Sequence, residues 1–282
     1  MPNTLFHASF AYRLGKELSC FSDDRSLNLY LLGSYGPDIF FYDRLPPTPF
    51  IQNQKHHGNL LHAAPSDKIA CALLNHANSS LFSYVYGFLT HIALDSTLHP
   101  YICSRTKGMD HTRFEGDIDS VIFHRYHDLI SFDRVIVFPD EIDMIDQLIT
   151  DVSLDVVNQT CPGAYKRSLK KLIRLYKIMY DPGAKRLHMI SNFEKFFHKE
   201  GIISGFLVGP GHCFFDDCMN EKHMPWTPKF FPNEKHTESV DELTMHAEIL
   251  AINLINSAKQ KDLAAISALC SDRNMQDGPL PR

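Results

Sequence analysis

One run of residues, GFLTHIALDSTLHP at Gly87–Pro100, constrains this chain more than any other. It places His91, Asp95 and His99 at steps of four residues. An α-helix completes a turn in about 3.6 residues, so three side chains at this spacing share one face. The first and last of them are separated by about 12 Å of helical rise, which is too far for one metal ion to span. The run therefore predicts a helix that serves two neighbouring metal ions, with Asp95 in the middle able to bridge them.

The neighbours of these residues are apolar, which predicts that the helix is largely buried. They are Leu89, Ile92, Ala93, Leu94 and Leu98. A buried aspartate must be paired or metal-bound to offset its desolvation. A histidine on an apolar face is more often a packed core residue than a ligand, but several metal-type residues in register favour the ligand interpretation.

A second motif follows directly. His111 and Glu115 are four residues apart, and Asp119 lies four further on. Apolar residues recur at three- and four-residue steps in this stretch, which predicts a helix that Asp110 could cap. Imidazole and carboxylate are ligands that zinc takes. Asp119 has two equally good interpretations, an outer partner that orients His111 or another ligand, or an ordinary helix carboxylate.

Composition narrows the class of protein. The chain has 282 residues, of which 44% are hydrophobic and 22% are charged, as in soluble globular proteins. Its formal net charge of -5 argues against a general nucleic-acid-binding surface, so we expect no stable nucleic-acid partner. Ten of the sixteen histidines lie in the first 127 residues, which places the chemistry in the N-terminal half. We find no secretory signal and no membrane-spanning run, and expect a cytoplasmic protein with reduced thiols.

The periodicity predicts an almost entirely helical single domain over residues 1–282. The metal ligands fall in residues 1–125, and residues 126–270 supply covering helices and a long loop. We expect the metal-binding helix to end before Pro100, because a helix usually ends ahead of a proline. We expect the tail after about Asp272 to be frayed. Helices are predicted at 8–18, 25–32, 66–78, 81–98, 141–158, 165–180, 187–200 and 239–258.

Four segments in this order resemble the bacterial zinc-dependent phospholipase C family, whose fold is shared by secreted alpha-toxins and fungal single-strand nucleases. They are GSYGPDIFFY (Gly33–Tyr42), GNLLH (Gly58–His62), GFLTHIALDSTLHPYI (Gly87–Ile102) and HTRFEGDID (His111–Asp119). The resemblance is strong over about residues 1–125, with a weaker echo at 226–228 and 238–243. It implies an all-α, multi-helix bundle around a polynuclear zinc site.

The resemblance also implies how two or three zinc ions are held. Asp38, His62, His91 and Asp95 would bind the first ion, and Asp95 would bridge to an ion held by His7. The remaining ion would be held by His99, His111 and Glu115. Asp38 is also the candidate catalytic residue. His56 and His57 are alternatives to His62, and the amine of Pro2, exposed by removal of Met1, is a possible further ligand.

The function that this implies is that of a zinc-dependent phosphodiesterase that cleaves phospholipid headgroups. A nuclease or nucleotidase on the same scaffold is the alternative, in which Phe40, Phe41 and Tyr42 would stack on a base instead of packing in the core. A third possibility is a metal-stabilised binding protein without turnover. The basic amphipathic helix predicted at Tyr165–Tyr180 is either a peripheral membrane contact or a solvated face.

Overall fold

The computed structural model describes residues 4–44, 54–126, 136–181, 183–197, 204, 207 and 214–280. The fold is all-α, as predicted, with a single short hairpin in the described residues. The elements are α1 (Thr4–Glu17), α2 (Asp24–Gly33), the 3₁₀ helix η1 (Gly36–Arg44), α3 (Gln54–Ala63), α4 (Ser66–His76), η2 (Ser79–Leu81), α5 (Phe82–Arg105), α6 (Met109–Tyr126), α8 (Ile142–Val157), α9 (Ala164–Met179), α10 (Lys185–Phe196), α11 (Val240–Lys259), α12 (Leu263–Cys270), β1 (Arg273–Asn274) and β2 (Gly278–Pro279).

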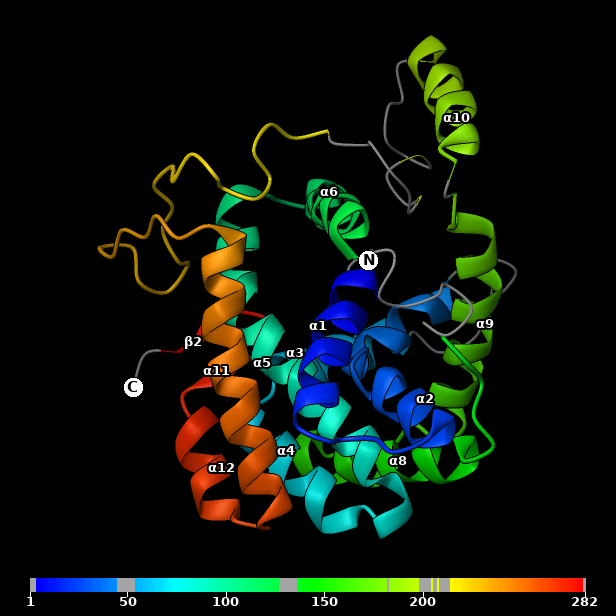
Figure 1. Ribbon diagram of the computed structural model, residues 1–282, viewed down its shortest axis with the longest axis vertical. Coiled ribbons are helices and arrows are strands. Elements are labelled where there is room, and N and C mark those ends of the chain that lie inside the picture. Colours follow the sequence, from blue (N-terminus) through cyan, green and yellow to red (C-terminus); the bar gives the residue numbers. More distant parts are fainter. Residues whose placement is uncertain are drawn as a thin grey trace.

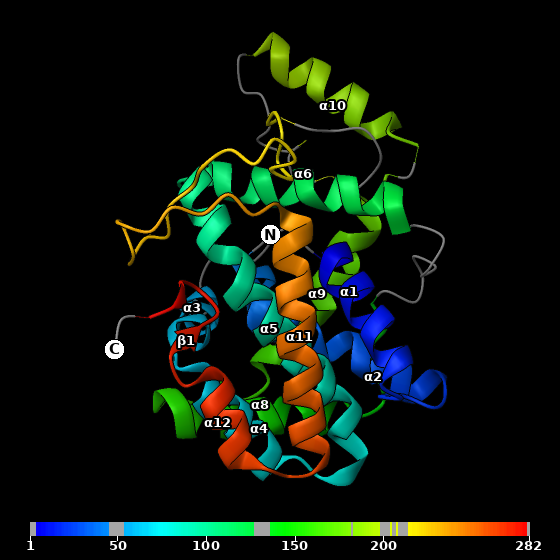
Figure 2. The same ribbon diagram turned by 60° about the vertical axis from the view of Figure 1, so that its left-hand side comes forward.

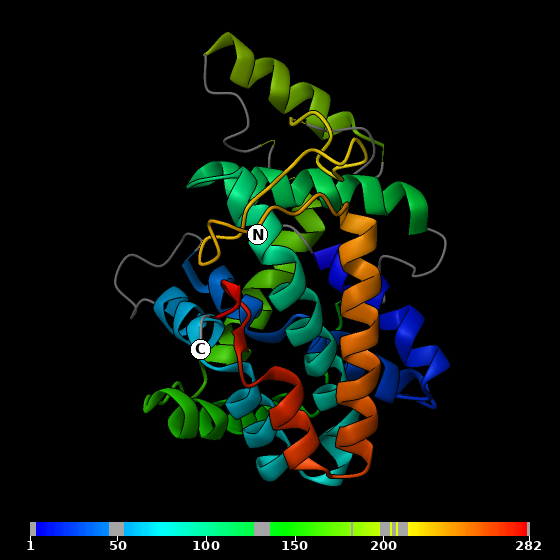
Figure 3. The same cartoon turned by 90° about the vertical axis from the view of Figure 1, so that its left-hand side faces the viewer.

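Helix α5 is the centre of the bundle. It contacts α1, α2, α4, α6 and α11, which surround it along its length. Figures 1 and 2 show α6 lying across one end of the bundle, with α10 beyond it at the same end. Figure 3 shows α11 running along the side of the bundle with α12 against its far end. Among the described residues, no helix is both long enough and apolar enough to cross a membrane.

Helices α2 and α5 touch backbone to backbone because each carries a glycine at the crossing. A Cβ atom at Gly87 would lie 1.9 Å from the carbonyl oxygen of Tyr30, and one at Gly33 would lie 2.0 Å from that of Tyr84. Real atoms cannot approach so closely, so neither position can hold a side chain unless the helices move apart. This contact sets the depth at which the predicted ligand helix sits in the bundle.

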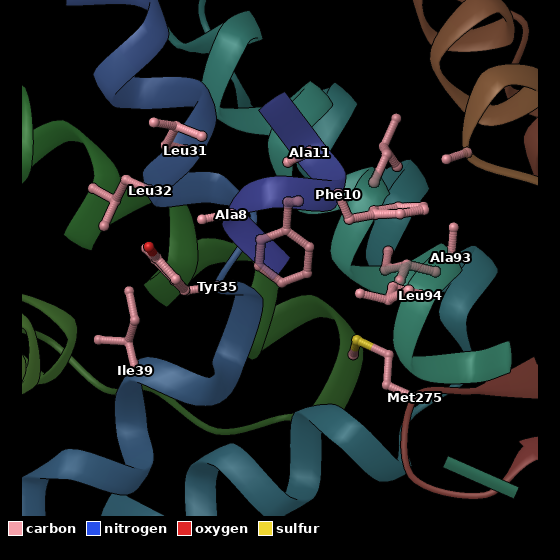
Figure 4. Close-up of a cluster of buried hydrophobic side chains, with 14 of the residues drawn as sticks. Ala8, Phe10, Ala11, Leu31, Leu32, Tyr35, Ile39, Ala93, Leu94 and Met275 are labelled. Atoms are coloured by element: carbon pink, nitrogen blue, oxygen red, sulfur yellow. The ribbon is translucent and has the colours of Figure 1, made fainter. Parts of the chain in front are cut away.

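The hydrophobic core lies directly beside the predicted ligands. Figure 4 shows side chains of α1, α2, η1 and α5 meeting there, among them Phe10, Leu31, Ile39 and Leu94. Met275, from the hairpin near the C-terminus, also points into this cluster and is fully buried. The ligand positions on α1 and α5 therefore alternate with residues that are packed on all sides.

Two predictions, one about the end of a helix and one about the order of the tail, were wrong. Helix α5 does not end before Pro100 but continues to Arg105 with the proline inside it. A proline within a helix removes one N–H donor and crowds the carbonyl four residues back. Here β2 packs against that turn, and a Cβ at Gly278 would lie 2.8 Å from the Ser96 carbonyl oxygen. The tail after Asp272 is not frayed but forms the β1–β2 hairpin.

Two further helices were not predicted, and one segment is more ordered than expected. Helix α3 and helix α12 lie in stretches for which the periodicity gave no helix. The stretch from Gly36, which lies outside the predicted helices, forms the 3₁₀ helix η1. Helix α11, by contrast, starts where its sequence predicts. Ser239 and Glu242 form a reciprocal capping box at its first turn.

Replacing Gly87 with alanine tests the contact between α2 and α5. The added Cβ would overlap the Tyr30 carbonyl, and overpacking of this kind costs about 1–3 kcal/mol. We expect Gly87→Ala to lower the free energy of unfolding by about that amount in urea melts. Gly183→Ala is the matched control, because a Cβ there would meet nothing closer than 3.8 Å. Equal stability of the two variants would contradict the close approach.

Candidate metal centre

Five elements supply the eight predicted ligands, and all eight lie within the described residues. The residues are His7 on α1, Asp38 on η1, His62 on α3, His91, Asp95 and His99 on α5, and His111 and Glu115 on α6. The structure brings seven of them into two groups. Asp38, His62, His91 and Asp95 form one, and His99, His111 and Glu115 form the other, with the potential ligand atoms of each group within 4.8 Å of one another.

Asp95 lies between the groups and links the eighth residue to them. Its Oδ1 atom is 3.1 Å from His7 Nε2. Its Oδ2 atom is 3.2 Å from His91 Nε2 and 3.6 Å from His62 Nε2. The same Oδ2 atom is 3.9 Å from His99 Nε2, which belongs to the second group. The two oxygens of one carboxylate thus face different histidines, which is the arrangement that a bridging ligand requires.

The second group is centred on one oxygen of Glu115. Its Oε1 atom lies 3.2 Å from His111 Nε2 and 3.5 Å from His99 Nε2. His111 and Glu115 are one helical turn apart on α6, whereas His99 comes from α5. The packing of α6 against α5 therefore assembles this group.

The orientation of two imidazoles is fixed by backbone carbonyls outside the cluster. His62 Nδ1 lies 2.8 Å from the Gly58 carbonyl oxygen, and His91 Nδ1 lies 3.1 Å from that of Ser34. A carbonyl accepts but cannot donate, so each Nδ1 atom carries the hydrogen. The Nε2 lone pair of each ring is then left for the cluster. Metal-binding histidines are commonly held in this way.

Gly36 makes room for one of these rings. Its backbone has a φ of +48°, a conformation that side chains disfavour. A Cβ atom there would lie 2.3 Å from His91 Cδ2. The glycine of the GPD motif is thus required by the turn and by the imidazole that lies against it.

Asp38 differs from the other carboxylates in its exposure to solvent. Its Oδ1 atom is 2.9 Å from His62 Nε2. About 20% of its side chain is exposed, compared with 4% for Asp95 and 7% for Glu115. Of the three carboxylates, Asp38 is therefore the one that a molecule from solution can reach.

The cluster strongly perturbs the titration of its members. Burial lowers the pKa of His62, but the neighbouring carboxylates of Asp38 and Asp95 outweigh it and raise the pKa to about 10. Burial is likewise outweighed at His99, where Asp95 and Glu115 raise the pKa to about 9. Burial raises the pKa of Asp95 itself, but the surrounding imidazoles hold it well below its usual value. Protons on these rings balance the buried carboxylates, and a metal cation would replace them with release of protons.

The donor set fits a metal. His91 Nε2 and Asp95 Oδ2 are both buried, and neither has a hydrogen-bond partner within the described residues. Buried polar atoms are seldom left in this state. They point to the same place, where imidazole nitrogen and carboxylate oxygen meet as zinc requires.

The structure separates His62 from its alternative His57. His57 is buried elsewhere, with Nε2 2.8 Å from Ser153 Oγ and its ring edge-on to Phe40. His56 lies on α3, but its side chain is outside the described residues. Met1 and Pro2 are also outside them, so the participation of the N-terminal amine stays a prediction.

Asp119 proves to have a role between its two interpretations. The carboxylate is fully buried and accepts the backbone N–H groups of Leu5 at 3.3 Å and Phe6 at 3.0 Å. A negative group at a helix N-terminus is stabilising. Burial raises the pKa of Asp119 to about 7, against the lowering effect of these two hydrogen bonds. Asp119 thus orients a ligand, but indirectly, by fixing the first turn of the helix that carries His7.

Sequence reasoning missed two supporting contacts because their partners are far away in the chain. Asp117 accepts the N–H groups of Phe214 and Phe215 at 2.7 and 2.8 Å, which anchors the segment after residue 213 to α6. The N–H groups of Met275 and Gln276 both lie 3.1 Å from the His62 carbonyl oxygen. Neither contact produces a spacing motif.

Comparison with models of protein families gives a match. The model of a family described as zinc dependent phospholipase C matches residues 6–170, which is more than half of the chain and includes all eight predicted ligands. The chain belongs to the zinc-dependent phospholipase C family. The match extends beyond the 1–125 region in which the resemblance was strong, through α8 and into α9. No curated protein and no solved structure matches the chain.

Membership in the zinc-dependent phospholipase C family indicates which metal these two groups of residues could bind. The family name states zinc dependence, and the two groups of histidine, aspartate and glutamate are of a kind that could bind it. The sequence and the structure therefore agree on the class of site, in a bundle whose helices converge on Asp95.

Removing the Asp119 carboxylate should loosen His7 and its metal. In Asp119→Ala the N–H groups of Leu5 and Phe6 lose their buried acceptor, at a cost of about 1–3 kcal/mol. We expect lower stability and zinc affinity reduced by about tenfold or more, measured by competition with a chelating dye. Asp119→Asn, which keeps one acceptor oxygen, should lose less. Asp110→Ala on the same helix is the exposed control. An Asp119→Ala variant that binds zinc as tightly as the unmutated protein would disprove the positioning role.

Proposed function

We propose that this protein is a zinc-dependent phosphodiester hydrolase that cleaves phospholipid headgroups. The observation that carries the proposal is the position of Asp95, with one oxygen 3.1 Å from His7 and the other 3.2 Å from His91. Metal ions held on both sides of this carboxylate would be close neighbours. Two or three zinc ions, bound by the eight residues named above, are the expected content.

The chain's own residues would divide the work of hydrolysis. Zinc, when bound, would act as a Lewis acid on the phosphoryl oxygens and would lower the pKa of a bound water molecule to near neutrality. Asp38 is partly exposed and is part of the first group, so it can accept the proton of the attacking water. The water oxygen forms a bond to phosphorus, the bond to the glycerol oxygen breaks, and the proton that Asp38 took from the water passes to that glycerol oxygen. The products are diacylglycerol and the phosphorylated headgroup.

The positions of three aromatic residues bear on the nuclease alternative. Phe40 and Tyr42 are buried in the core and cannot stack on a base. Phe41 is partly exposed, but its ring lies against His62 with 5.2 Å between centroids. Two of the three rings on which the nuclease alternative relied are therefore not accessible to a base.

A substrate panel tests the proposed function. Protein reconstituted with zinc is assayed for bound metal and for turnover of phosphatidylcholine in mixed micelles, a nucleotide and single-stranded DNA. We expect zinc to be bound and the phospholipid to be cleaved to diacylglycerol. Cleavage of DNA or nucleotide alone would establish the nuclease alternative, and bound zinc without turnover would establish a binding protein. Failure to bind zinc would overturn the whole proposal.

Asp95→Asn should do more damage than His99→Asn. The asparagine keeps the shape of Asp95 but removes the charge that balances cations on both sides, whereas His99 belongs to one group. We expect Asp95→Asn to lose more zinc and more activity when both variants are measured side by side by elemental analysis and phospholipid turnover. Equal losses would show that Asp95 does not bridge.

A further inference from the structure

Helix α10 presents its apolar face to solvent instead of to the core. Met189, Phe193 and Phe196 follow one another at helical spacing, and Phe197 completes the same face. Between 52% and 79% of each of these residues is exposed. Single exposed apolar residues are ordinary, but a contiguous group of large ones marks an interaction surface.

The outward orientation of this face is held by hydrogen bonds on the opposite side of the helix. Glu194 is buried and accepts the backbone N–H of Ser204 at 3.1 Å. Asp181, also buried, accepts the N–H of Leu187 at 2.8 Å in the first turn of α10. Leu187 itself is buried. Leu187 and Glu194 therefore point inward, and the phenylalanines are left outside.

The exposed charges of α9 and α10 all have one sign. Nine basic and two acidic residues lie in residues 164–197, within a chain whose net charge is -5. The two acids are Asp181 and Glu194, both buried and hydrogen-bonded. The exposed basic residues are Arg167, Lys170, Arg174, Lys177, Lys185, Arg186 and Lys195.

The combination of an apolar face and exposed basic residues indicates what binds to α10. An apolar face with aromatic residues and flanking cations suits the boundary between the headgroups and acyl chains of an anionic bilayer. A second copy of the chain would oppose two like-charged arms, which repel. A neutral apolar partner would leave the cations unused.

We propose that α10 and the adjoining end of α9 are an arm that binds an anionic lipid surface. The inference extends the proposed function, on which it rests, by naming where the enzyme meets its substrate. Figures 1 and 2 show α10 beyond α6 at the end of the bundle where α1 begins. Helix α6 carries His111 and Glu115, and α1 carries His7, so the arm and the metal centre belong to the same end of the molecule.

Vesicles without phosphodiesters separate binding from turnover. Zinc-loaded protein is sedimented with galactolipid vesicles that contain sulfatide, an anionic lipid that this enzyme could not hydrolyse, and with galactolipid vesicles alone. We expect binding to the anionic vesicles that weakens as salt is added. Absence of binding to the anionic vesicles, or equal binding to both kinds, would overturn the proposal.

Variants then assign the binding to the arm. Phe193→Ser combined with Phe196→Ser should reduce vesicle binding by about tenfold for each ring removed. Met245→Ser with Ile249→Ser, two comparably exposed residues of α11, is the matched control. Lys185→Glu with Lys195→Glu should abolish the preference for sulfatide, whereas Lys222→Glu with Lys235→Glu, the same change elsewhere, should not. Binding that survives the arm variants would refute the proposal.

Activity distinguishes this inference from the proposed function. On a short-chain phosphatidylcholine below its micellar concentration, the phenylalanine variants should turn over as fast as the unmutated protein. On anionic phospholipid vesicles they should be slower by about the factor lost in binding. Vesicle binding without any phospholipid cleavage would defeat the proposed function alone. If the phenylalanine variants lose dimers that the unmutated protein forms in sedimentation velocity, and still bind vesicles equally well, the face instead binds a second copy of this chain.

Discussion

The carboxylate of Asp95, buried in the middle of α5, is the constraint on which the rest of the structure depends. A charge removed from water costs several kcal/mol unless partners of opposite sign surround it. Four imidazoles from α1, α3 and α5 lie within 3.9 Å of its two oxygens. The helices that carry them must therefore converge on one point. The close crossing at Gly87 and the small residue at Gly36 allow that convergence without leaving space for side chains between the backbones.

The two helices that contribute ligands from a distance are each held at the end nearest the site. The first turn of α1 has N–H groups that no helical carbonyl can accept, and Asp119 accepts two of them. In the last turn of α3 it is the carbonyl groups that have no N–H partner within the helix. The N–H groups of Met275 and Gln276 meet the His62 carbonyl there. Groups that every helix end leaves unpaired are thus used to place His7 and His62.

Spacing within one helix was enough to predict the central part of the site. His91, Asp95 and His99 share a face because helical geometry is local, and the same holds for His111 and Glu115. The all-α fold followed from periodicity for the same reason. The position of His7 against Asp95 joins residues 88 apart in the chain, and no pattern in the sequence expresses it. It was reached through the family resemblance.

Other features were missed because tertiary packing overrides a local rule. Pro100 is tolerated inside α5, since β2 packs against the turn that it disturbs. The tail beyond Asp272, which has few apolar residues, was expected to fray. It is ordered because the Met275 side chain is fully buried in the core cluster. A contact with residues so far back in the chain has no signature in the tail's own composition.

The hairpin that closes on α3 also sets an order of assembly. His62 leaves the ribosome early, whereas the two amides that hold its carbonyl belong to Met275 and Gln276 and are made more than two hundred residues later. During that interval the last turn of α3 lacks its donors and the core lacks the Met275 side chain. In a nascent chain the ligands are therefore all present well before the hairpin emerges, but the last turn of α3, which carries His62, is not yet anchored.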